Sequence, residues 1–317
     1  MTGQSMPVVT VIIPAYNAAT HIAETIEHVL RQTLADVEVI VVDDGSSDHT
    51  ADVVARYPTV RYVKKDNGGV SSARNVGAQL ARAHWISFVD SDDLWHPEML
   101  ASMLELMRTH PTAAMGLSGS TALTDKARLS APIERIDGAL PSRVVTDFRE
   151  VFRFPYLGMS SVIVERDRFL KLGGFNETLR RAEDVDLFLR LIHGSPGYVR
   201  LLFPAVHVRT VEGSLSSDSI AGYVQLQGVY QRFLAVHTSF AQENAPLVRQ
   251  TLGDLHLRHG RALLRAERRQ EARHQAWRSI GQAPTVAALG LLARTLVPSS
   301  WLYAARRLFK LDHHDGA

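Results

Sequence analysis

The sequence contains no cysteine in its 317 residues. This absence excludes disulfide bonds, zinc–thiolate sites and thiol nucleophiles, so any chemistry has to come from other side chains. Long apolar runs are also lacking, because the best candidate, residues 286–311, is interrupted by three arginines and one proline. A membrane-spanning helix needs roughly 18 apolar residues in succession. The first seven residues carry no basic cluster, and we expect no secretory signal there.

The overall composition is that of a globular protein, with 45% hydrophobic and 21% charged residues. The length is enough for one large α/β domain with a helical appendage, or for two ordinary domains. The net charge of +2 is unevenly distributed, because residues 256–310 hold eleven Arg and Lys against only Glu267 and Glu271. An acidic body is therefore joined to a basic tail.

The first hundred residues alternate between β-branched apolar runs and segments with helical periodicity. We predict strands at residues 8–14, 37–42, 60–64 and 85–89, and helices at 20–31, 50–57, 71–83 and from Pro97 to about 110. Continuous apolar strands separated by helices predict an α/β fold with a mostly parallel sheet flanked by helices. Ligands bind such sheets outside the carboxyl ends of their strands.

The pattern is less regular further along the chain. We predict a long loop at residues 117–143, a strand at 159–164, a short helix beginning at Phe169 and a helix at 184–192. After residue 219 the sequence becomes arginine-rich and helical. We therefore expect a catalytic domain over residues 1–218 and a basic, helical C-terminal region over 219–317.

Two carboxylates follow the second predicted strand, in Asp43-Asp44-Gly45. Adjacent buried carboxylates are costly unless they bind something. In one interpretation Asp44 accepts hydrogen bonds from the base or ribose of a nucleotide. In the other, this is an acidic turn in which Ser46, Ser47 and Asp48 cap the next helix.

A denser acidic group, Asp90-Ser91-Asp92-Asp93, follows the fourth predicted strand. Oxygen ligands alone favour Mg²⁺ or Mn²⁺, held by one or two carboxylates together with substrate phosphates. We assign Asp92 as the direct metal ligand and Asp90 to the ribose or a metal-bound water. A solvated acidic turn before Pro97 is the alternative. A two-aspartate phosphatase site would also fit these four residues. Such a site needs its motif on the first strand, where this chain has the apolar run of residues 8–14 instead.

Three further groups have both a structural and a functional interpretation. Glu183-Asp184 begins a predicted helix, where Asp184 either complements the helix dipole or acts as a general base. Asn67-Gly68-Gly69 with Arg74 opens another helix and could meet a phosphate. His207 and Arg209, followed by Ser214, Ser216 and Ser217, form the third group, as structural residues or as a phosphate or metal contact.

Placed in order, these segments resemble the family-two glycosyltransferases with the GT-A fold, over roughly residues 8–217. Six ordered motifs carry the resemblance: Pro14-Ala15-Tyr16-Asn17, Val42 to Asp48, Asn67-Gly68-Gly69 with Ala73 to Gly77, Phe88 to Asp93, Gly173-Gly174-Phe175, and Glu183 to Leu187. Many relatives carry a histidine where this chain has Val211-Glu212-Gly213, and His207 lies further upstream.

The resemblance implies an inverting transferase that moves a sugar from a nucleoside diphosphate, UDP above all, to an acceptor hydroxyl. Its nucleotide-sugar contacts would be Pro14, Ala15, Tyr16, Asp44, Arg74, Asp90 and Ser91. Asp90 and Asp92 would form the DxD metal site for Mn²⁺ or Mg²⁺, and Asp184 would be the catalytic base. Glu183 and His207 are the accessory residues. The acceptor would be a glycan or a lipid-linked molecule of a bacterial polysaccharide or glycolipid pathway.

Two other functions compete with this one. A nucleotidyltransferase shares the carboxylate–metal chemistry but normally has a glycine-rich, basic loop after the first strand, which residues 15–19 lack. A non-catalytic nucleotide-sugar binding or scaffolding protein would not need Asp44, Asp92 and Asp184 together.

The basic tail has three interpretations: helices packed on the catalytic domain, contact with an anionic membrane surface, and nucleic-acid binding, for which no recognition module is present. We expect a cytoplasmic protein, with the inner membrane surface as a peripheral site.

Overall fold

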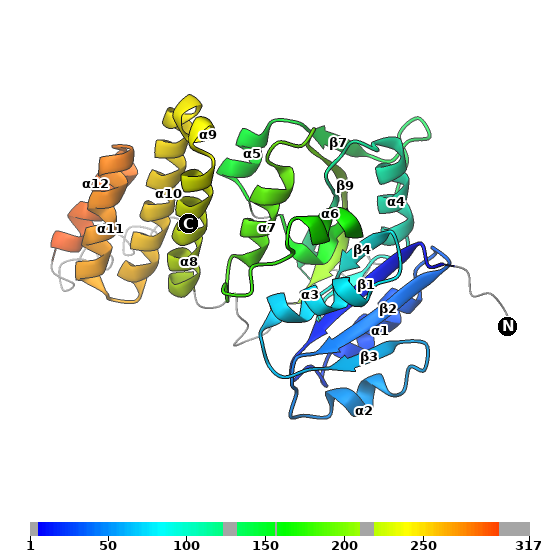
Figure 1. The fold of residues 1–317 in the computed structure, drawn as a ribbon. Coiled ribbons are helices and arrows are strands. Elements are labelled where there is room, and N and C mark those ends of the chain that lie inside the picture. Colours follow the sequence, from blue (N-terminus) through cyan, green and yellow to red (C-terminus); the bar gives the residue numbers. More distant parts are fainter. Residues whose placement is uncertain (1–5, 123–131, 156, 210–218, 298–317) are drawn as a thin grey trace, which may run out of the picture. The chain divides into compact units, whose positions relative to one another are not determined.

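The chain forms two compact units, residues 1–214 and 215–317, in the computed structural model (Figure 1). The structure describes residues 6–122, 132–155, 157–209 and 219–297. The first unit is built around a sheet, and the second consists of helices.

The sheet of the first unit has nine strands in the order β3-β2-β1-β4-β8-β6-β9-β5, with β7 paired to β9. The strands are β1 (Val9–Ala15), β2 (Val37–Asp43), β3 (Arg61–Lys64), β4 (Trp85–Phe88), β5 (Leu94–Trp95), β6 (Gly116–Ala122), β7 (Ser142–Val145), β8 (Val162–Glu165) and β9 (Tyr198–Val208).

The N-terminal half of this sheet is parallel, as the sequence predicts. Strand β1 pairs with both β2 and β4, with Ala15 opposite Asp43 and Ile12 opposite Phe88. Because these strands run in the same direction and in close register, the loops that follow them emerge at one edge. Both acidic groups of the sequence lie in those loops.

The second half of the sheet mixes directions, since β8 is antiparallel to β4 and β6, whereas β6 is parallel to β9. The prediction of a long loop over residues 117–143 is wrong at both ends. Gly116–Ala122 forms strand β6, and Ser142 and Arg143 begin strand β7. Strand β6 is rich in Gly and Ser, so pairing on both sides by β8 and β9 determines its conformation rather than its own propensity.

The helices of the first unit are α1 (Ile22–Leu30), α2 (Thr50–Val54), α3 (Val70–Leu80), α4 (Met99–Thr109), α5 (Phe148–Arg153), α6 (Arg166–Lys171) and α7 (Glu183–Ile192), with a short 3-10 helix at Met159–Ser161. Alternate residues of β1 point to opposite faces. Val11 and Ile13 belong to the core that includes residues of α1 and α4. On the other face, Ala73 of α3 packs on β2.

A glycine allows α3 to lie close to the sheet. A Cβ atom at Gly77 would be 2.4 Å from the Cγ2 atom of Ile12 in β1, which is far inside van der Waals contact. Because α3 carries Arg74 and begins at the Asn67–Gly69 turn, this close packing fixes both relative to the strand ends.

The second unit contains α8 (Ser219–Val236), α9 (Thr238–Glu243), α10 (Ala245–Arg265), α11 (Arg269–Gln282) and α12 (Val286–Leu296). Leu257, Ala276, Ala288 and Leu291 form a small core between the last three helices. A polar layer adjoins it, in which His256 Nδ1 contacts Gln275 Oε1 at 2.8 Å. Among the residues that the structure describes, no helix combines the length and the apolar character needed to cross a membrane.

Candidate functional site

Hydrogen bonds join the loops after β1 and β2 into one surface. Asn17 N donates to Ser46 Oγ at 2.9 Å, and Ser47 N donates to Asn17 Oδ1 at 2.9 Å. Asp48 Oδ2 accepts from Ala19 N at 3.1 Å. The Ser46–Asp48 group, for which helix capping was one interpretation of the sequence, therefore ties the two loops together, whereas α2 has His49 at its N-cap and no side-chain cap hydrogen bond.

The predicted nucleotide contacts of the first loop differ in exposure. Pro14 and Ala15 are buried at the end of β1, whereas the Tyr16 side chain is 55% exposed. Tyr16 therefore has a ring face free to stack on a planar base. Asp43 is fully buried and has a structural role, since its carboxylate accepts from Ser46 N at 2.7 Å and Tyr62 OH at 2.5 Å.

Asp44 is nearly buried and accepts three hydrogen bonds. Its Oδ1 accepts from Lys65 Nζ at 2.6 Å and Gly68 N at 2.9 Å, and its Oδ2 accepts from Gly69 N at 2.6 Å. An ionised carboxylate has about four acceptor positions, so Oδ2 can still accept from a ligand. Asp44 thus holds the glycine turn that opens α3 and retains capacity for one more donor. Lys65 had no role in the sequence interpretation, although it directly follows β3 at the same edge of the sheet.

Arg74 connects two acidic groups that are far apart in the sequence. Its buried guanidinium donates to Asp90 Oδ1 at 2.6 Å and to Glu183 Oε1 at 3.0 Å, and it lies 5.2 Å from the centroid of the Phe175 ring. Burial disfavours the charged form, but the charges of Asp90, Glu183 and Asp184 hold its pKa above the usual value. The structure shows carboxylate partners for Arg74, and pairing with phosphate stays a prediction.

The acidic loop after β4 is held from several sides. Asp90 N donates to Ser160 Oγ at 3.1 Å, and Arg209 Nε donates to Asp92 O at 3.2 Å. Ser91 is half-buried in the turn between them. Burial, and then the charge of Asp90, raises the pKa of Asp92; the same two causes raise the pKa of Asp93 to about 7. Bringing these carboxylates together is therefore unfavourable without a cation.

This donor set fits a divalent cation chemically. Within the described ranges, no group of three or more His, Asp or Glu side chains forms a ready metal site. Mg²⁺ and Mn²⁺ do not require one, because one or two carboxylates combine with substrate phosphates and water to complete their coordination. Asp90 and Asp92 would supply the carboxylates, and neutralising their repulsion would favour binding.

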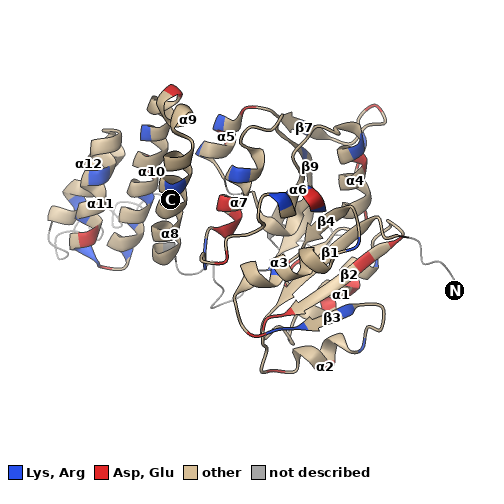
Figure 2. Cartoon of the chain, in the orientation of Figure 1, with Lys and Arg blue, Asp and Glu red and all other residues tan. Residues whose placement is uncertain are grey.

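Asp184 lies in the first turn of α7, directly after the Glu183 that Arg74 binds. The first turn of α7 is red in Figure 2, since it contains Glu183, Asp184 and Asp186. Burial, and then the charge of Glu183, raises the pKa of Asp184 to about 6. Its Oδ1 accepts from Val185 N at 2.8 Å. A carboxylate that is ionised at neutral pH but binds a proton more readily than usual is suited to general-base catalysis.

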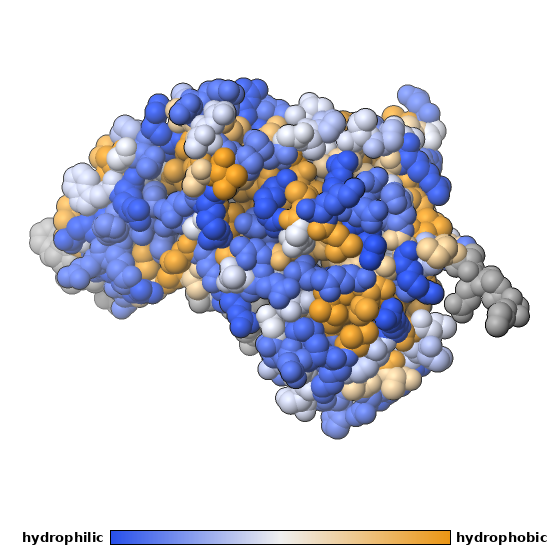
Figure 3. All heavy atoms as spheres, in the orientation of Figure 1, coloured by the Kyte–Doolittle hydropathy of each residue, from blue (hydrophilic) through white to orange (hydrophobic). Residues whose placement is uncertain are grey.

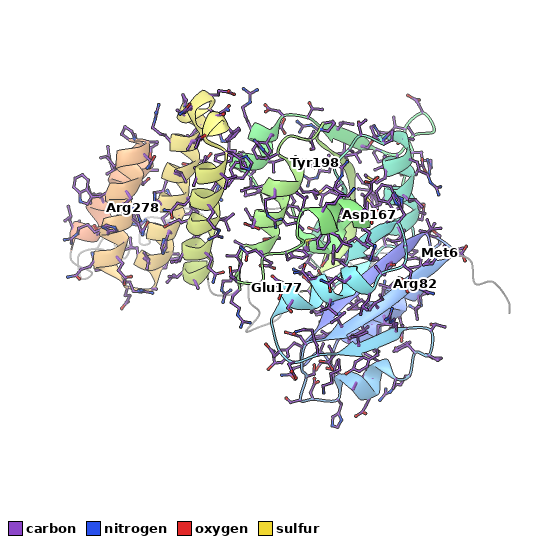
Figure 4. All side chains as sticks on the ribbon, viewed as in Figure 1. Met6, Arg82, Asp167, Glu177, Tyr198 and Arg278 are labelled. Atoms are coloured by element: carbon purple, nitrogen blue, oxygen red, sulfur yellow. The ribbon has the colours of Figure 1, made fainter. Side chains whose placement is uncertain are left out.

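The loop before α7 is positioned by Asn75, to which the sequence interpretation gave no role. Asn75 Oδ1 accepts from Phe175 N at 2.8 Å, and its Nδ2 donates to Phe175 O and Glu177 Oε1, each at 2.9 Å. Glu177 is labelled in Figure 4. Gly174 faces Asn75 so closely that a Cβ there would lie 2.5 Å from Oδ1. Adjacent residues of α3 thus fix both ends of the segment that leads to Asp184.

His207 lies in β9 opposite Leu94 of β5 and is fully buried. It is therefore close in register to the acidic loop that ends at Asp93. Arg209 Nη2 also pairs with Glu24 Oε2 of α1 at 2.5 Å. Ser214, Ser216, Ser217 and the segment Val211–Gly213 lie outside the described residues.

Known proteins resemble this chain in sequence. Residues 10–136 match the model of glycosyl transferase family 2. A 194-residue segment is 29% identical to an uncharacterized glycosyltransferase of Rickettsia felis, covering 60% of this chain and 32% of that protein. The chondroitin synthase of Escherichia coli is 28% identical over 204 residues, which cover 62% of this chain and 28% of that protein. The matched segments thus span about a third of these two relatives.

Solved structures resemble it in fold. TarS 1–349 of S. aureus, in complex with UDP-GlcNAc, has a TM-score of 0.60 at 20% identity over 88% of this chain and 90% of that one. The mannosyltransferase PcManGT of Pyrobaculum calidifontis, in complex with GDP-Man and Mn²⁺, has a TM-score of 0.59 at 22% identity. The match covers 96% of this chain and 84% of PcManGT. Residues 10–136 are therefore similar to glycosyl transferase family 2, and the chain has the GT-A fold of these solved structures.

Proposed function

We propose that this protein is a metal-dependent, inverting glycosyltransferase that uses a UDP-sugar as donor and a hydroxyl group as acceptor. The observation that carries the proposal is the double ion pair of Arg74 with Asp90 and Glu183. It brings the acidic loop after β4, which suits a cation and a diphosphate, beside the carboxylate that suits a general base. We further propose that residues 1–218 act as the catalytic domain.

Each carboxylate has a distinct role in the proposed reaction. The Asp184 carboxylate accepts the proton of the acceptor hydroxyl as its oxygen bonds to the anomeric carbon. The bond from that carbon to the diphosphate breaks on the opposite face, and its electron pair leaves with the diphosphate, so the configuration inverts. Asp92 and Asp90 would hold Mn²⁺ or Mg²⁺, which when bound supplies charge neutralisation for the leaving group. Asp44 and Tyr16 would bind the nucleoside.

Several parts of this proposal rest on relatives rather than on residues. The UDP donor is supported by the TarS complex with UDP-GlcNAc, and the metal by the PcManGT complex with Mn²⁺. A role in bacterial polysaccharide or glycolipid synthesis, and a cytoplasmic location at the inner membrane surface, follow from the family resemblance. We propose the basic C-terminal region, 219–317, as the part that contacts an anionic membrane.

The proposal is tested by thermal unfolding with UDP, with and without Mn²⁺. We expect UDP and Mn²⁺ together to raise the unfolding temperature more than either alone, because a ligand that binds only the folded state stabilises it. Asp92→Asn should remove the part of this temperature increase that depends on Mn²⁺. Asp184→Asn should keep the whole increase but abolish UDP release from a UDP-sugar. Stabilisation of the Asp92→Asn variant equal to that of the wild type would refute the assigned metal site.

A further inference from the structure

Large apolar side chains are exposed on the last two helices. Trp277 of α11 is 58% exposed, and Val286, Leu289 and Leu296 of α12 are 88%, 53% and 61% exposed. In α12 these residues recur at intervals of three and seven, so they form one stripe along the helix. Figure 3 shows apolar patches among the charged residues on the visible face of this unit.

These residues lie on the side of α11 and α12 that faces away from α10. Ser279 Oγ of α11 bonds to Gly253 O of α10 at 2.8 Å, and Leu291 of α12 packs against Gly260 of α10. Trp277 is two positions from Ser279, and Leu289 is two positions from Leu291. Two positions turn a helix by about 200°. Since α11 and α12 also pack against each other, we group Trp277 and the α12 stripe as one surface, which we call the α11–α12 face.

The charges on α11 and α12 are mostly positive. The two helices contain the cations Arg269, Arg273, Arg278 and Arg294 and one acid, Glu271, which pairs with Arg268 at 2.7 Å. Arg278, labelled in Figure 4, and Arg294 are exposed. Apolar residues flanked mainly by cations match the interface of an anionic lipid bilayer, where the apolar groups insert and the cations meet the headgroups.

We propose that the α11–α12 face is the surface that binds an anionic membrane. Charge complementarity selects this occupant, because a second copy of the same cationic face would be repelled. The inference deepens the membrane contact included in the proposed function and assigns it to particular residues. Its test measures membrane binding and not transferase activity. Failure of the membrane proposal can therefore be distinguished from failure of the proposed transferase function.

Binding is measured by co-sedimentation of the full chain with vesicles. We expect binding to vesicles of equal parts phosphatidylglycerol and phosphatidylcholine, weakening with added salt, and much less to pure phosphatidylcholine. Leu289→Glu combined with Leu296→Glu should lower the partition coefficient by roughly tenfold or more, since both change insertion into repulsion. The control is Val236→Glu on α8, which is 76% exposed outside this face and should bind as the wild type does.

The proposal fails if the wild type ignores anionic vesicles or if the double variant binds them equally well. A dimer in light scattering that the double variant dissociates, without vesicle binding, would assign the face to a second copy instead. Circular dichroism of the variants checks that the helices remain folded. Leu289 and Leu296 are already in contact with solvent, so replacing them should leave the helices folded.

Discussion

Replacing Asp184 by asparagine should stabilise the protein at alkaline pH while removing the proposed catalytic base. In the folded state burial and Glu183 raise the pKa of this carboxyl from 3.8 to about 6. A carboxylate with a raised pKa is held in an environment that disfavours its charge, and each pKa unit corresponds to about 1.4 kcal/mol. Keeping Asp184 ionised at pH 8 therefore costs about 3 kcal/mol, which the neutral amide avoids.

The sign of the pH dependence follows from linkage. The folded protein binds a proton at Asp184 more tightly than the unfolded chain does, so its contribution to stability is largest below pH 4. That contribution is lost as the pH rises through about 6. The advantage of Asp184→Asn should therefore be about 3 kcal/mol at pH 8 and about 1 kcal/mol at pH 4.5.

Urea unfolding of the metal-free protein at the two pH values measures this difference. Asp52→Asn is the matched control, because Asp52 is a 73% exposed carboxylate in α2 and its replacement should change the free energy of unfolding little at either pH. If Asp184→Asn is no more stable than the wild type at pH 8, the folded structure does not disfavour the ionised form of Asp184. An advantage that does not depend on pH would refute the electrostatic origin.

Four further results are expected. The kcat/KM of donor turnover should fall as the pH drops below about 6, because Asp184 becomes protonated; a profile flat from pH 5 to 8 would exclude it as the base. Gly77→Ala should destabilise the protein by about 1–3 kcal/mol in urea unfolding, because the new methyl group would clash with Ile12. Asn75→Ala should cost about 2–3 kcal/mol by the same measurement, because it leaves the N–H and C=O of Phe175 without their partner. EDTA should abolish UDP release from the donor and Mn²⁺ should restore it, and full activity in EDTA would exclude a required metal.

The parallel half of the fold could be predicted because its signals are local. Val9–Ala15, Val37–Asp43 and Trp85–Phe88 are apolar strands separated by helices, and topology alone brings the ends of such strands to one edge. The placement of the Asp44 and Asp90 loops on a single rim followed from that rule.

The partners of the site residues could not be predicted, because they depend on long-range packing. Arg74 and Glu183 are 109 positions apart, and nothing in either segment indicates the other. Strand β6 was missed for a related reason, since its sequence, Gly-Leu-Ser-Gly-Ser-Thr-Ala, has little strand propensity of its own. Its conformation comes from the neighbours that it pairs with.

The three hydrogen bonds at Asp44 have a consequence for how its variants should be interpreted. The same carboxylate that we propose as the nucleoside contact anchors Gly68 and Gly69, and these residues open the helix that carries Arg74 and Asn75. A disturbance at Asp44 would therefore spread through α3 to the acidic loop and to the segment before α7. An Asp44→Ala variant would lose activity partly by misaligning groups that never touch the base.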